Sequence, residues 1–405
     1  MVIYPKDWKR YSFRSFFKLL TNNTLSRDKL SSSGETGDIH YGDILVKYGS
    51  TISSSDDIPR IKPDFHFQAT DYLQKNDVII ADTAEDETVG KMIQIGDVDF
   101  PLVSGLHTIA CRPTIETADG YLGYYMNSKC WHDQLLPYIV GTKVSSVSKK
   151  SLRETELYLP ADISEQRSIV EALAGMDTHI ANLTELIEKK KAIRDGALED
   201  LVSGRTRLVG FHGKWICTAL NEIAKVYDGT HQTPKYVSSG IRFVSVENIN
   251  AIYESNKYIK RTDFERDFKV QPIKGDILMT RIGDIGSTCL IESDEPIAYY
   301  VSLALLKQIK INSMYLCYAM KGSQFMKELD DRTLHHATPK KINKGEIGKC
   351  LVWYPSDPEE QRMIASTLSD MDEEIHCLSV ERDKMQRIKA GVMDDLLTGR
   401  VRLIG

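Results

Sequence analysis

Residues 160–210 read PADISEQRSIVEALAGMDTHIANLTELIEKKKAIRDGALEDLVSGRTRLVG, and residues 355–405 read PSDPEEQRMIASTLSDMDEEIHCLSVERDKMQRIKAGVMDDLLTGRVRLIG. The two stretches align without a gap at an offset of 195, and roughly 18 of the 44 positions from EQR to RxRL are identical. A period of this length is too long for a solenoid. The chain is therefore read as a duplicated module in which a globular part is followed by a helix, twice.

Each copy has the apolar spacing of one long helix. Steps of four and three residues put the apolar side chains on a stripe that packs against a partner helix. The seam positions are Ile169, Leu173, Met176, Ile180, Leu183 and Ile187 in the first copy and Ile364, Leu368, Met371, Ile375 and Leu378 in the second. The seam loosens over 189–191 and 382–384. It is expected to resume at Ile193, Ala197 and Leu201 in the first copy and at Ile388, Val392 and Leu396 in the second. The alternative is two core helices of an ordinary domain, which rarely run this long unbroken.

Start signals of the two helices match. Asp162 and Asp357 are the expected N-caps, and Pro358 suits the first helical position. Glu165 and Glu360 follow the caps by three residues and complete a capping-box pattern. About 40 helical residues at 1.5 Å each predict a rod of roughly 60 Å.

Glycines recur at matched positions in the two copies. Gly204 and Gly399 are expected to end the helices, since glycine adopts the left-handed conformation that closes a helix. Gly196 and Gly391 fall inside both helices, where glycine costs about 1 kcal/mol relative to alanine. These internal glycines predict either close helix–helix approach or a bend.

Length, composition and charge limit the kinds of protein that this chain can be. A length of 405 residues predicts two to three domains, and seven scattered cysteines favour a reducing cytosol over structural zinc or disulfides. The apolar runs are too short for a signal peptide or a membrane span, so a cytoplasmic protein is expected. Net charge is −5 overall, yet residues 211–354 carry about +4. Such a chain would bind DNA weakly without a partner that supplies positive charge.

The globular parts show an α+β pattern. Strands are predicted at 43–47, 77–81, 106–111 and 157–159 in the first part and at 241–246, 276–280 and 301–309 in the second. Helices are predicted over 121–136 and 314–329. The segments NDVIIADT (76–83) and YLGYYMNS (121–128) match GDILMTRI (275–282) and YLCYAMKG (315–322), so the duplication includes the globular parts. The domain boundaries that follow are 1–159, 160–210, 211–354 and 355–405.

No catalytic arrangement is evident. The chain lacks a Walker loop, and RIGDIGST (281–288) lacks the GxGxxG fingerprint. His335, His336 and Cys350 do not have metal-ligand spacing. Neither a catalytic residue nor a metal site is therefore predicted.

Polar segments of the recognition type remain. Glutamine and asparagine suit adenine and lysine suits guanine, while mixed hydroxyls and lysines fit phosphates. Ser146 and Lys150 belong to the same first-part segment, 141–150, which precedes the helix as 336–344 does in the second part. An ordinary polar surface is the competing interpretation. The candidate DNA-binding residues are Lys47, His107, Lys143, Ser145, Lys149, His231, Gln232, Thr233, Lys235, Asn248, Arg281, Thr338, Lys340, Lys341 and Lys344.

Several motifs occur in a fixed order along the chain. The most specific are the paired helices, DGTHQTPKY (228–236) and GIRFVSVENI (240–249). KGDILMTRIGDIG (274–286), LSRDKLSSSGETGDIHYGDILVKY (25–48) and NDVIIADTAEDETVGK (76–91) are further marks. With these motifs the chain resembles, over its full length, the DNA-specificity subunits of type I restriction–modification systems.

The resemblance implies two α/β target recognition domains separated by two long antiparallel coiled-coil helices, with a pseudo-two-fold axis. Each domain would read one half of a bipartite DNA site, and the helices would set the number of unread base pairs between the halves. The chain itself would hold no cofactor and catalyse nothing. Two methyltransferase subunits would bring S-adenosylmethionine and methylate adenine, and restriction subunits would bring nuclease activity with ATP and Mg.

Two other classes of function stay open. A structural adaptor would use the same helices to join two protein-binding domains without touching DNA, and salt-dependent binding to duplex DNA in the presence of a methyltransferase separates the two. A fused restriction enzyme is disfavoured because no methyltransferase or nuclease motif is present.

Overall fold

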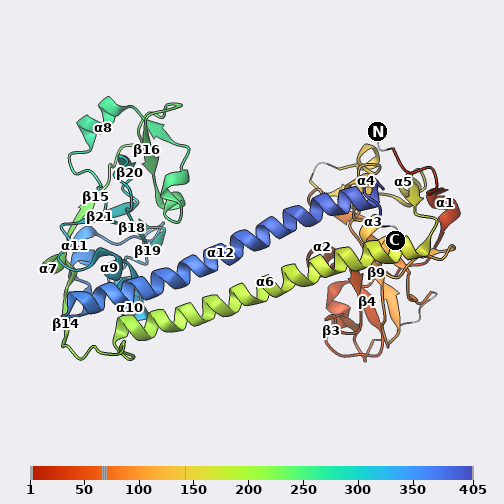
Figure 1. Cartoon of the computed structure of the whole chain (residues 1–405), viewed down its shortest axis with the longest axis horizontal. Coiled ribbons are helices and arrows are strands. Elements are labelled where there is room, and N and C mark those ends of the chain that lie inside the picture. The colour runs from red at the N-terminus through yellow and green to blue at the C-terminus, as the bar shows by residue number, and fades with distance from the viewer. Residues whose placement is uncertain (1–2, 66, 68, 70, 142, 404–405) are drawn as a thin grey trace. The chain divides into compact units, whose positions relative to one another are not determined.

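The computed structural model describes residues 3–65, 67, 69, 71–141 and 143–403. The chain divides into two compact units, one formed by Met1–Leu183 with Glu381–Gly405 and the other by Thr184–Val380. Both long helices are divided between the units, so each unit holds a globular part and one half of each helix. The helices can be followed in Figure 1, α6 in yellow-green and α12 in blue.

The long helices have the predicted ends. Helix α6 spans Ile163–Ser203 and helix α12 spans Pro358–Leu397. The Asp162 carboxylate accepts a hydrogen bond from the Ser164 N–H, and the Asp357 carboxylate accepts one from the Glu359 N–H. Gly204 and Gly399 follow the helices with φ of +72° and +71°, as a left-handed helix end requires. The predicted caps and stops are confirmed.

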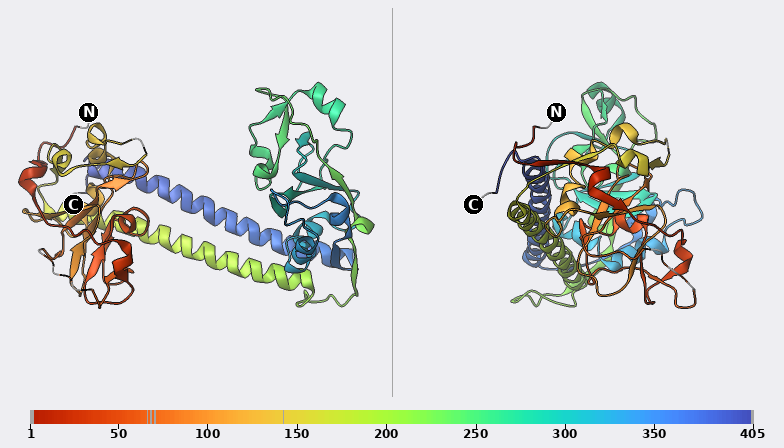
Figure 2. Two further views of the ribbon diagram at one scale, coloured as in Figure 1. Left: turned by 180° about the vertical axis from the view of Figure 1, so that it is seen from behind. Right: turned by 90° about the vertical axis from the view of Figure 1, so that its right-hand side faces the viewer.

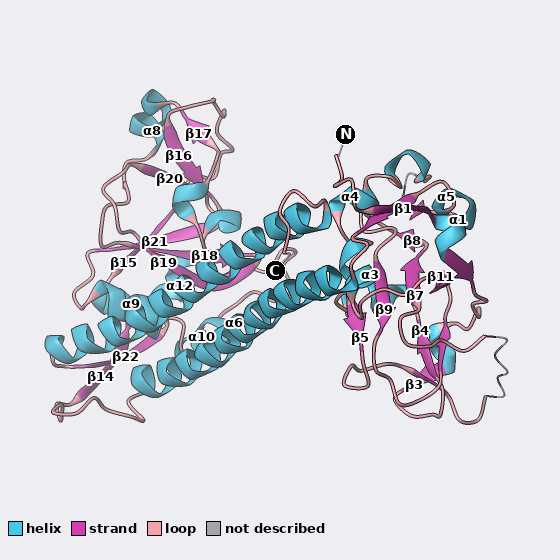
Figure 3. Ribbon diagram, turned by 45° about the vertical axis from the view of Figure 1, so that its right-hand side comes forward, coloured by secondary structure: helices cyan, strands magenta, loops and turns pink. Residues whose placement is uncertain are grey.

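The first unit is built around a sheet of order β2-β11-β7-β9-β5 (Figure 3). A second sheet has the order β10-β4-β6-β3, and the pairs β1-β13 and β12-β8 complete the β-structure of the described residues. The strands are β1 (Lys9–Ser12), β2 (Phe17–Leu19), β3 (Leu30–Ser31), β4 (Gly37–Ile39), β5 (Thr51–Ile52), β6 (Arg60–Ile61), β7 (Val78–Ala81), β8 (Thr83–Ala84), β9 (Met92–Ile95), β10 (Leu102–Ser104), β11 (Thr108–Pro113), β12 (Ser145–Ser146) and β13 (Glu156–Leu159). The short helices are α1 (Phe13–Phe16), α2 (Tyr41–Val46), α3 (Tyr121–Tyr125), α4 (Lys129–His132) and α5 (Lys149–Leu152).

The second unit repeats the plan. Its main sheet has the order β15-β21-β18-β19, a smaller sheet has the order β17-β16-β20, and β14 pairs with β22. Figure 2 shows this unit from behind in green to light blue. The strands are β14 (Trp215–Ala219), β15 (Lys225–Asp228), β16 (Ile241–Val244), β17 (Tyr258–Ile259), β18 (Ile277–Ile282), β19 (Asp284–Leu290), β20 (Ile297–Tyr299), β21 (Leu303–Lys307) and β22 (Leu351–Pro355). The helices are α7 (Leu220–Ile223), α8 (Arg261–Asp267), α9 (Ser313–Ala319), α10 (Ser323–Asp331) and α11 (Lys344–Lys349).

Equivalent strands occupy equivalent places in the two units. Strand β7 pairs antiparallel with β11 and β9, as β18 pairs with β21 and β19. The parallel pair β4–β10 corresponds to the parallel pair β16–β20. The predicted duplication of the globular parts is therefore confirmed by their strand pairing.

Each core is completed by the two long helices. In the first unit Ile169 and Leu173 of α6 and Leu396 of α12 are buried with the residues of the main sheet. In the second unit Ile364 and Leu368 of α12 are buried together with Leu201 of α6. The start of one helix and the end of the other thus belong to the same core, so the two halves run in opposite directions within each unit.

Most of the predicted seam is confirmed. Ile169, Leu173, Leu183, Ile187 and Leu201 of α6 are buried, as are Ile364, Leu368 and Leu396 of α12. The prediction is wrong at Ile193 and Ile388, which are 60% and 41% exposed. Gly196 and Gly391 have open space where a Cβ would stand, so close helix approach at these glycines, one of the two predicted alternatives, is excluded.

Residues 43–46 lie in helix α2 and Lys47 directly follows it, so the strand predicted at 43–47 is wrong. The His40 side chain caps the helix by accepting from the Gly42 N–H, and the Asp43 carboxylate pairs with Arg27. Ile44 is buried in a cluster that includes Ile79 of the main sheet and Ile39 of the second sheet. A short apolar run is compatible with either element, and here the cap and the ion pair decide for the helix.

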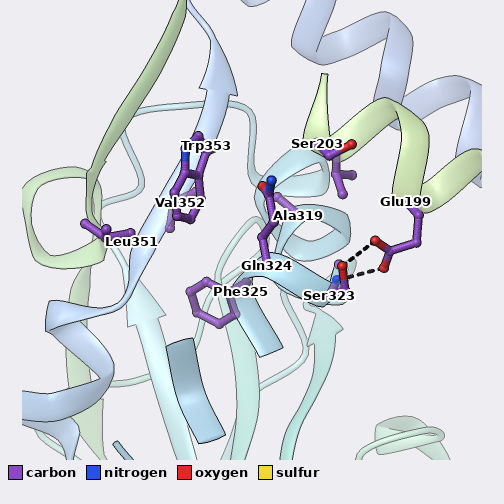
Figure 4. Close-up of a pocket in the computed structure, with 11 residues that line it drawn as sticks. Glu199, Ser203, Ala319, Ser323, Gln324, Phe325, Leu351, Val352 and Trp353 are labelled. Atoms are coloured by element: carbon purple, nitrogen blue, oxygen red, sulfur yellow. Dashed lines mark hydrogen bonds between the residues drawn. The ribbon is translucent and has the colours of Figure 1, made fainter. Parts of the chain in front are cut away.

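The two helices predicted at 121–136 and 314–329 are each broken. The first divides into α3 and α4 at Asn127, whose side chain bonds the backbone of Met92 in β9. The second divides into α9 and α10 at Gly322, where a Cβ would lie 2.6 Å from Val202 of α6. Figure 4 shows the result: Ser323 begins α10 and donates from its N–H and hydroxyl to Glu199 of α6.

The repeated glutamates have a different role from the predicted capping box. Both oxygens of the Glu165 carboxylate are held by the Arg402 guanidinium, and both oxygens of Glu360 by Arg207. Glu165 and Glu360 are buried. The neighbouring glutamines are matched as well: the Gln166 side chain accepts from the Ala118 N–H, and Gln361 accepts from the Asn312 N–H.

A third matched contact lies further along the helices. In the first unit, Asp177 of α6 accepts from the Tyr124 hydroxyl and pairs with Lys389 of α12. In the second unit, Asp372 accepts from the Tyr318 hydroxyl and pairs with Arg194. Residues shared by the two copies thus include the polar groups that attach each globular part to both helices.

Candidate nucleic-acid interface

In the second unit, the segment 338–344 lies beside the end of strand β18. The Gly283 N–H donates to the Lys340 carbonyl at 2.8 Å, and Ile282 and Lys341 form a β-bridge. The Ile342 N–H donates to the Arg281 carbonyl at 3.0 Å, which fixes the register of the segment. Lys340 and Lys341 are therefore presented from an ordered strand-like stretch.

Arg281 is buried under this segment, with 7% of its surface exposed. Its Nη1 forms an ion pair with Asp228, and its Nε donates to the Ile342 carbonyl at 3.1 Å. In this structure the guanidinium is used within the unit and is not presented to a nucleic acid. The sequence alone did not indicate that Arg281 would pair with Asp228, the last residue of β15.

The loop after β15 supplies the exposed candidates His231, Gln232, Thr233 and Lys235. Thr230 fixes the start of this loop, since it bridges Tyr300 and its hydroxyl accepts from the Gln232 N–H at 3.3 Å. The candidates of the segment 338–344 are exposed as well, namely Thr338, Lys340, Lys341 and Lys344. Amide, imidazole, hydroxyl and ammonium groups of this kind can bond base edges and phosphates.

Asn248 has a structural hydrogen bond. Its side-chain oxygen accepts from the Ser245 N–H at 3.1 Å and so caps a 3-10 helix at Val246–Asn248. Base reading of adenine uses both the oxygen and the amino group of an asparagine side chain. Asn248 is therefore a weaker candidate for base reading than Gln232.

The first unit places its own basic, hydroxylated segment in the equivalent position. Ser146 pairs with Thr83 in β8, and the Val147 N–H donates to the Asp82 carbonyl at 2.9 Å. Ser145 lies in β12, and Lys149 and Lys150 lie exposed in the first turn of α5. Lys143 is exposed just before them, and residue 142 of the predicted segment lies outside the described residues.

By its backbone hydrogen bond, His107 of the first unit is equivalent to Ser302 of the second. The carbonyl of each accepts from the residue that ends the central strand, His107 from Asp82 and Ser302 from Arg281. The His107 Nδ1 lies 3.4 Å from the Asp82 carboxylate, and the ring meets Tyr41 edge-on. His107 and the 143–150 segment thus share Asp82 as a neighbour.

Lys47 belongs to a different element. It follows α2, and its ammonium pairs with the Asp57 carboxylate at 2.6 Å. The structure therefore brings together most of the predicted residues of each unit around one strand end, while Lys47 is held by another loop. Apart from the buried Arg281, all of them remain candidates for DNA contact.

Burial shifts the pKa of two groups of the first unit, one in strand β4 and one directly after it. Burial raises the pKa of Asp38 to about 6, against a lowering contribution from its hydrogen bond with Asn23. Burial also lowers the pKa of His40, and the positive charge of Arg27 acts in the same direction. A neutral His40 is what its role as the cap of α2 requires, since the ring nitrogen must accept.

Within the described ranges, no group of three or more His, Cys, Asp or Glu residues is arranged to hold a metal ion. No helix among the residues that the structure describes is both long and apolar enough to cross a membrane.

Comparison with known proteins gives a consistent result. A family model described as "Type I restriction modification DNA specificity domain" matches residues 5–192 and 213–385. Two curated relatives come from Methanocaldococcus jannaschii. One, the type I restriction enzyme MjaVIII specificity subunit, is 23% identical over 70% of this chain and 71% of its own length. The other, a putative type I restriction enzyme MjaX specificity subunit, is 20% identical over 98% and 95%.

Solved structures agree in fold. An S subunit of a type I restriction–modification system from M. genitalium superposes with a TM-score of 0.56 at 15% identity, covering 96% of each chain. A chain from a study titled as the structural basis of complex assembly and conformational transition of the type I R-M system gives 0.61 at 14% identity, covering 99% of this chain and 100% of that one.

Proposed function

Because the chain belongs to the family of type I restriction–modification DNA specificity subunits, we propose that its two globular parts are target recognition domains. Each reads one half of a bipartite DNA sequence. The chain performs no chemistry of its own, and the reactions belong to the subunits that assemble with it.

One observation carries this proposal. Two separately folded units each present a lysine- and hydroxyl-rich segment beside the end of the same central strand, at Ser145–Ser146 and at Lys340–Lys341. The scaffold is the same, but the exposed side chains differ. Two domains that recognise different half-sites need a shared scaffold with different exposed side chains. Phosphate contacts position such a domain on DNA, and side chains at the base edges specify the sequence.

We assign the loop after β15 to base reading in the second domain, with Gln232 as its main candidate. Lys340, Lys341 and Lys344 are assigned to phosphates. In the first domain the corresponding phosphate residues are Lys143, Lys149 and Lys150, with Ser145 and His107 beside them. Lys47 is placed at the margin of the first interface.

The long helices are the proposed spacer. Helix α6 has 41 residues and α12 has 40, and a helix of this length measures roughly 60 Å. If the helices pair as an antiparallel coiled coil along their whole length, they fix the number of base pairs between the half-sites. Half-sites about one DNA turn apart, near 34 Å, would suit such a spacer.

The proposed partners are double-stranded DNA, two methyltransferase subunits and, where the system has them, restriction subunits. S-adenosylmethionine would be bound by the methyltransferase, and ATP and Mg by the restriction subunit. The proposed reaction of the complex is methylation of adenine at N6, with DNA cleavage when restriction subunits join.

The deciding experiment is co-expression with the neighbouring methyltransferase followed by genome-wide mapping of methylated adenine. A single bipartite motif with a constant spacer is expected. Absence of any motif, together with no salt-dependent binding of the complex to duplex DNA, would instead support a protein-binding adaptor. Insertion of the same few residues in both helices in register should change the spacer and leave both half-sites intact.

A further inference from the structure

The buried Arg281 contacts the segment 338–344 and the residue that precedes the loop 229–240. Its carbonyl accepts from the Ile342 N–H at 3.0 Å and its Nε donates to the Ile342 carbonyl at 3.1 Å, so it holds the 338–344 segment twice. Its Nη1 pairs with Asp228, the residue directly before the loop 229–240. Its N–H donates to the Ser302 carbonyl at 2.9 Å.

The local backbone is shaped for this arrangement. The pairing of β18 with β19 shifts register between Met279 and Arg281, which is the mark of a β-bulge. Bulges redirect the side chains that follow them and are frequent next to functional sites. The Asp228 carboxylate also lies 3.4 Å from the Lys344 ammonium, so it stands between a buried and an exposed cation.

We propose that Arg281 and Asp228 are a positioning pair that sets the loop 229–240 against the segment 338–344 and so determines the specificity of the second half-site. This inference rests on the proposed function of the chain. Arg281 acts through the two segments and touches no base itself.

The Arg281–Asp228 pair orients the two segments more than it stabilises the unit. A buried ion pair contributes little net stability, because desolvating two charges offsets most of their attraction, and neutral groups of similar size can replace it at small cost. A planar guanidinium, however, donates in fixed directions, here to a carboxylate and a carbonyl that belong to different segments. Losing the pair should therefore loosen the relation between the segments more than it destabilises the unit.

The first unit does not share this pair. The residue equivalent to Arg281 is Asp82, whose carbonyl accepts from Val147 as that of Arg281 accepts from Ile342. The Asp82 carboxylate faces the exposed His107 ring at 3.4 Å instead of a buried guanidinium. Changes at Arg281 should accordingly leave the first half-site untouched.

The test uses the full chain in complex with its methyltransferase. The variants are the neutral pair Arg281→Met with Asp228→Asn, the single Arg281→Met and the conservative Arg281→Lys. Arg242→Met is the matched control, since Arg242 is also mostly buried in the second unit and lies 3.4 Å from the Glu295 carboxylate but holds neither segment. Methylated adenines are mapped genome-wide for each, and hydrogen–deuterium exchange of 229–240 is followed.

In the neutral pair we expect methylation at sites with one wrong base in the second half to rise about tenfold relative to cognate sites, the equivalent of one lost base contact. Amides of 229–240 should exchange faster, the first half-site should stay unchanged, and Arg281→Lys should restore part of the discrimination. Arg242→Met should leave the motif unaltered.

An unchanged second half-site in a complex that still methylates its bipartite motif would overturn the positioning role and leave the proposed function standing. Equal loss of discrimination at both half-sites would overturn it as well. If the single Arg281→Met chain fails to fold, the neutral pair and Arg281→Lys decide the matter. A wild-type complex that methylates no bipartite motif would contradict the proposed function instead.

Discussion

Arg402 holds both carboxylate oxygens of Glu165, a residue 2% exposed in the first turn of α6. The Arg402 guanidinium also pairs with Asp7 and lies over the Trp8 ring, so it ties the N-terminal residues, the start of α6 and the segment after α12 together. Arg207 repeats the contact with Glu360 and Trp215 in the second unit.

Arg402→Met should destabilise the first unit by about 3 kcal/mol, because it leaves the Glu165 carboxylate buried without its partner. Urea unfolding followed by tryptophan fluorescence measures the change, with Trp8 and Trp131 in the first unit and Trp215 and Trp353 in the second. Arg400→Met is the control, since Arg400 pairs with Asp394 and Asp395 at the surface. An Arg402→Met chain as stable as the control would contradict the assignment.

The pair Asp177–Lys389 should show measurable coupling between the two helices. Both side chains are partly exposed, so a double-mutant cycle with Asp177→Ala and Lys389→Ala should give about 0.5–1 kcal/mol. The exchanged chain Asp177→Lys with Lys389→Asp should regain part of the loss, measured by thermal unfolding at low and high salt. Independent, additive effects would mean that the pair is formed without contributing to stability.

Matched glycines should respond in opposite ways to alanine. Gly196→Ala and Gly391→Ala should each stabilise the chain by about 0.5–1 kcal/mol, since a Cβ there meets open space and alanine favours a helix. Gly399→Ala should destabilise it, because its φ is +71° and a Cβ would lie 2.5 Å from Pro5. Thermal unfolding of the four single variants, including Gly204→Ala, gives the comparison. A destabilising Gly391→Ala would indicate a packing role for that glycine.

The stability of the first unit should depend on pH through Asp38. Burial raises its pKa to about 6, against about 3.9 in an unfolded chain. The folded state therefore binds the proton first as pH falls, so the stability from this group is fully present below pH ~4 and is lost as pH rises through about 6.

Asp38→Asn removes this dependence. The variant should be more stable than the wild type above pH 7, by up to about 3 kcal/mol, and the difference should vanish near pH 4. Hydrogen–deuterium exchange of the β4 and β10 amides, compared at each pH, locates the effect. A difference that stays constant from pH 4 to pH 8 would point to packing instead of titration.

Lysines and the glutamine of the second unit should affect DNA binding differently. Lys340→Ala and Lys341→Ala should weaken binding to every sequence and each lower the salt slope by about 1, because each removes a phosphate contact. Gln232→Ala should instead cost about 1–3 kcal/mol at the cognate half-site and little elsewhere. Binding of the assembled complex to cognate and altered duplexes over a salt series measures both. Asn248→Ala, whose side chain caps a 3-10 helix, serves to compare a structural loss.

The repeat by itself determined the two long helices, their first and last residues and the duplication of the globular parts. Apolar spacing, capping aspartates and terminal glycines are local signals, and local signals suffice where one helix extends without interruption. The position of 141–150 and 336–344 before the helices also followed from the alignment, because equivalent segments occupy equivalent places in a duplicated fold.

Only the tertiary structure decided what the polar residues contact. Glu165 resembles a capping residue in sequence but pairs with Arg402, and Arg281 resembles a DNA contact but pairs with Asp228. The strand expected at 43–47 became a helix because the His40 cap and the Arg27–Asp43 pair favour it. A buried charged side chain pairs with the group that lies next to it in the folded protein. Because that group can come from any part of the chain, no local sequence pattern can identify it.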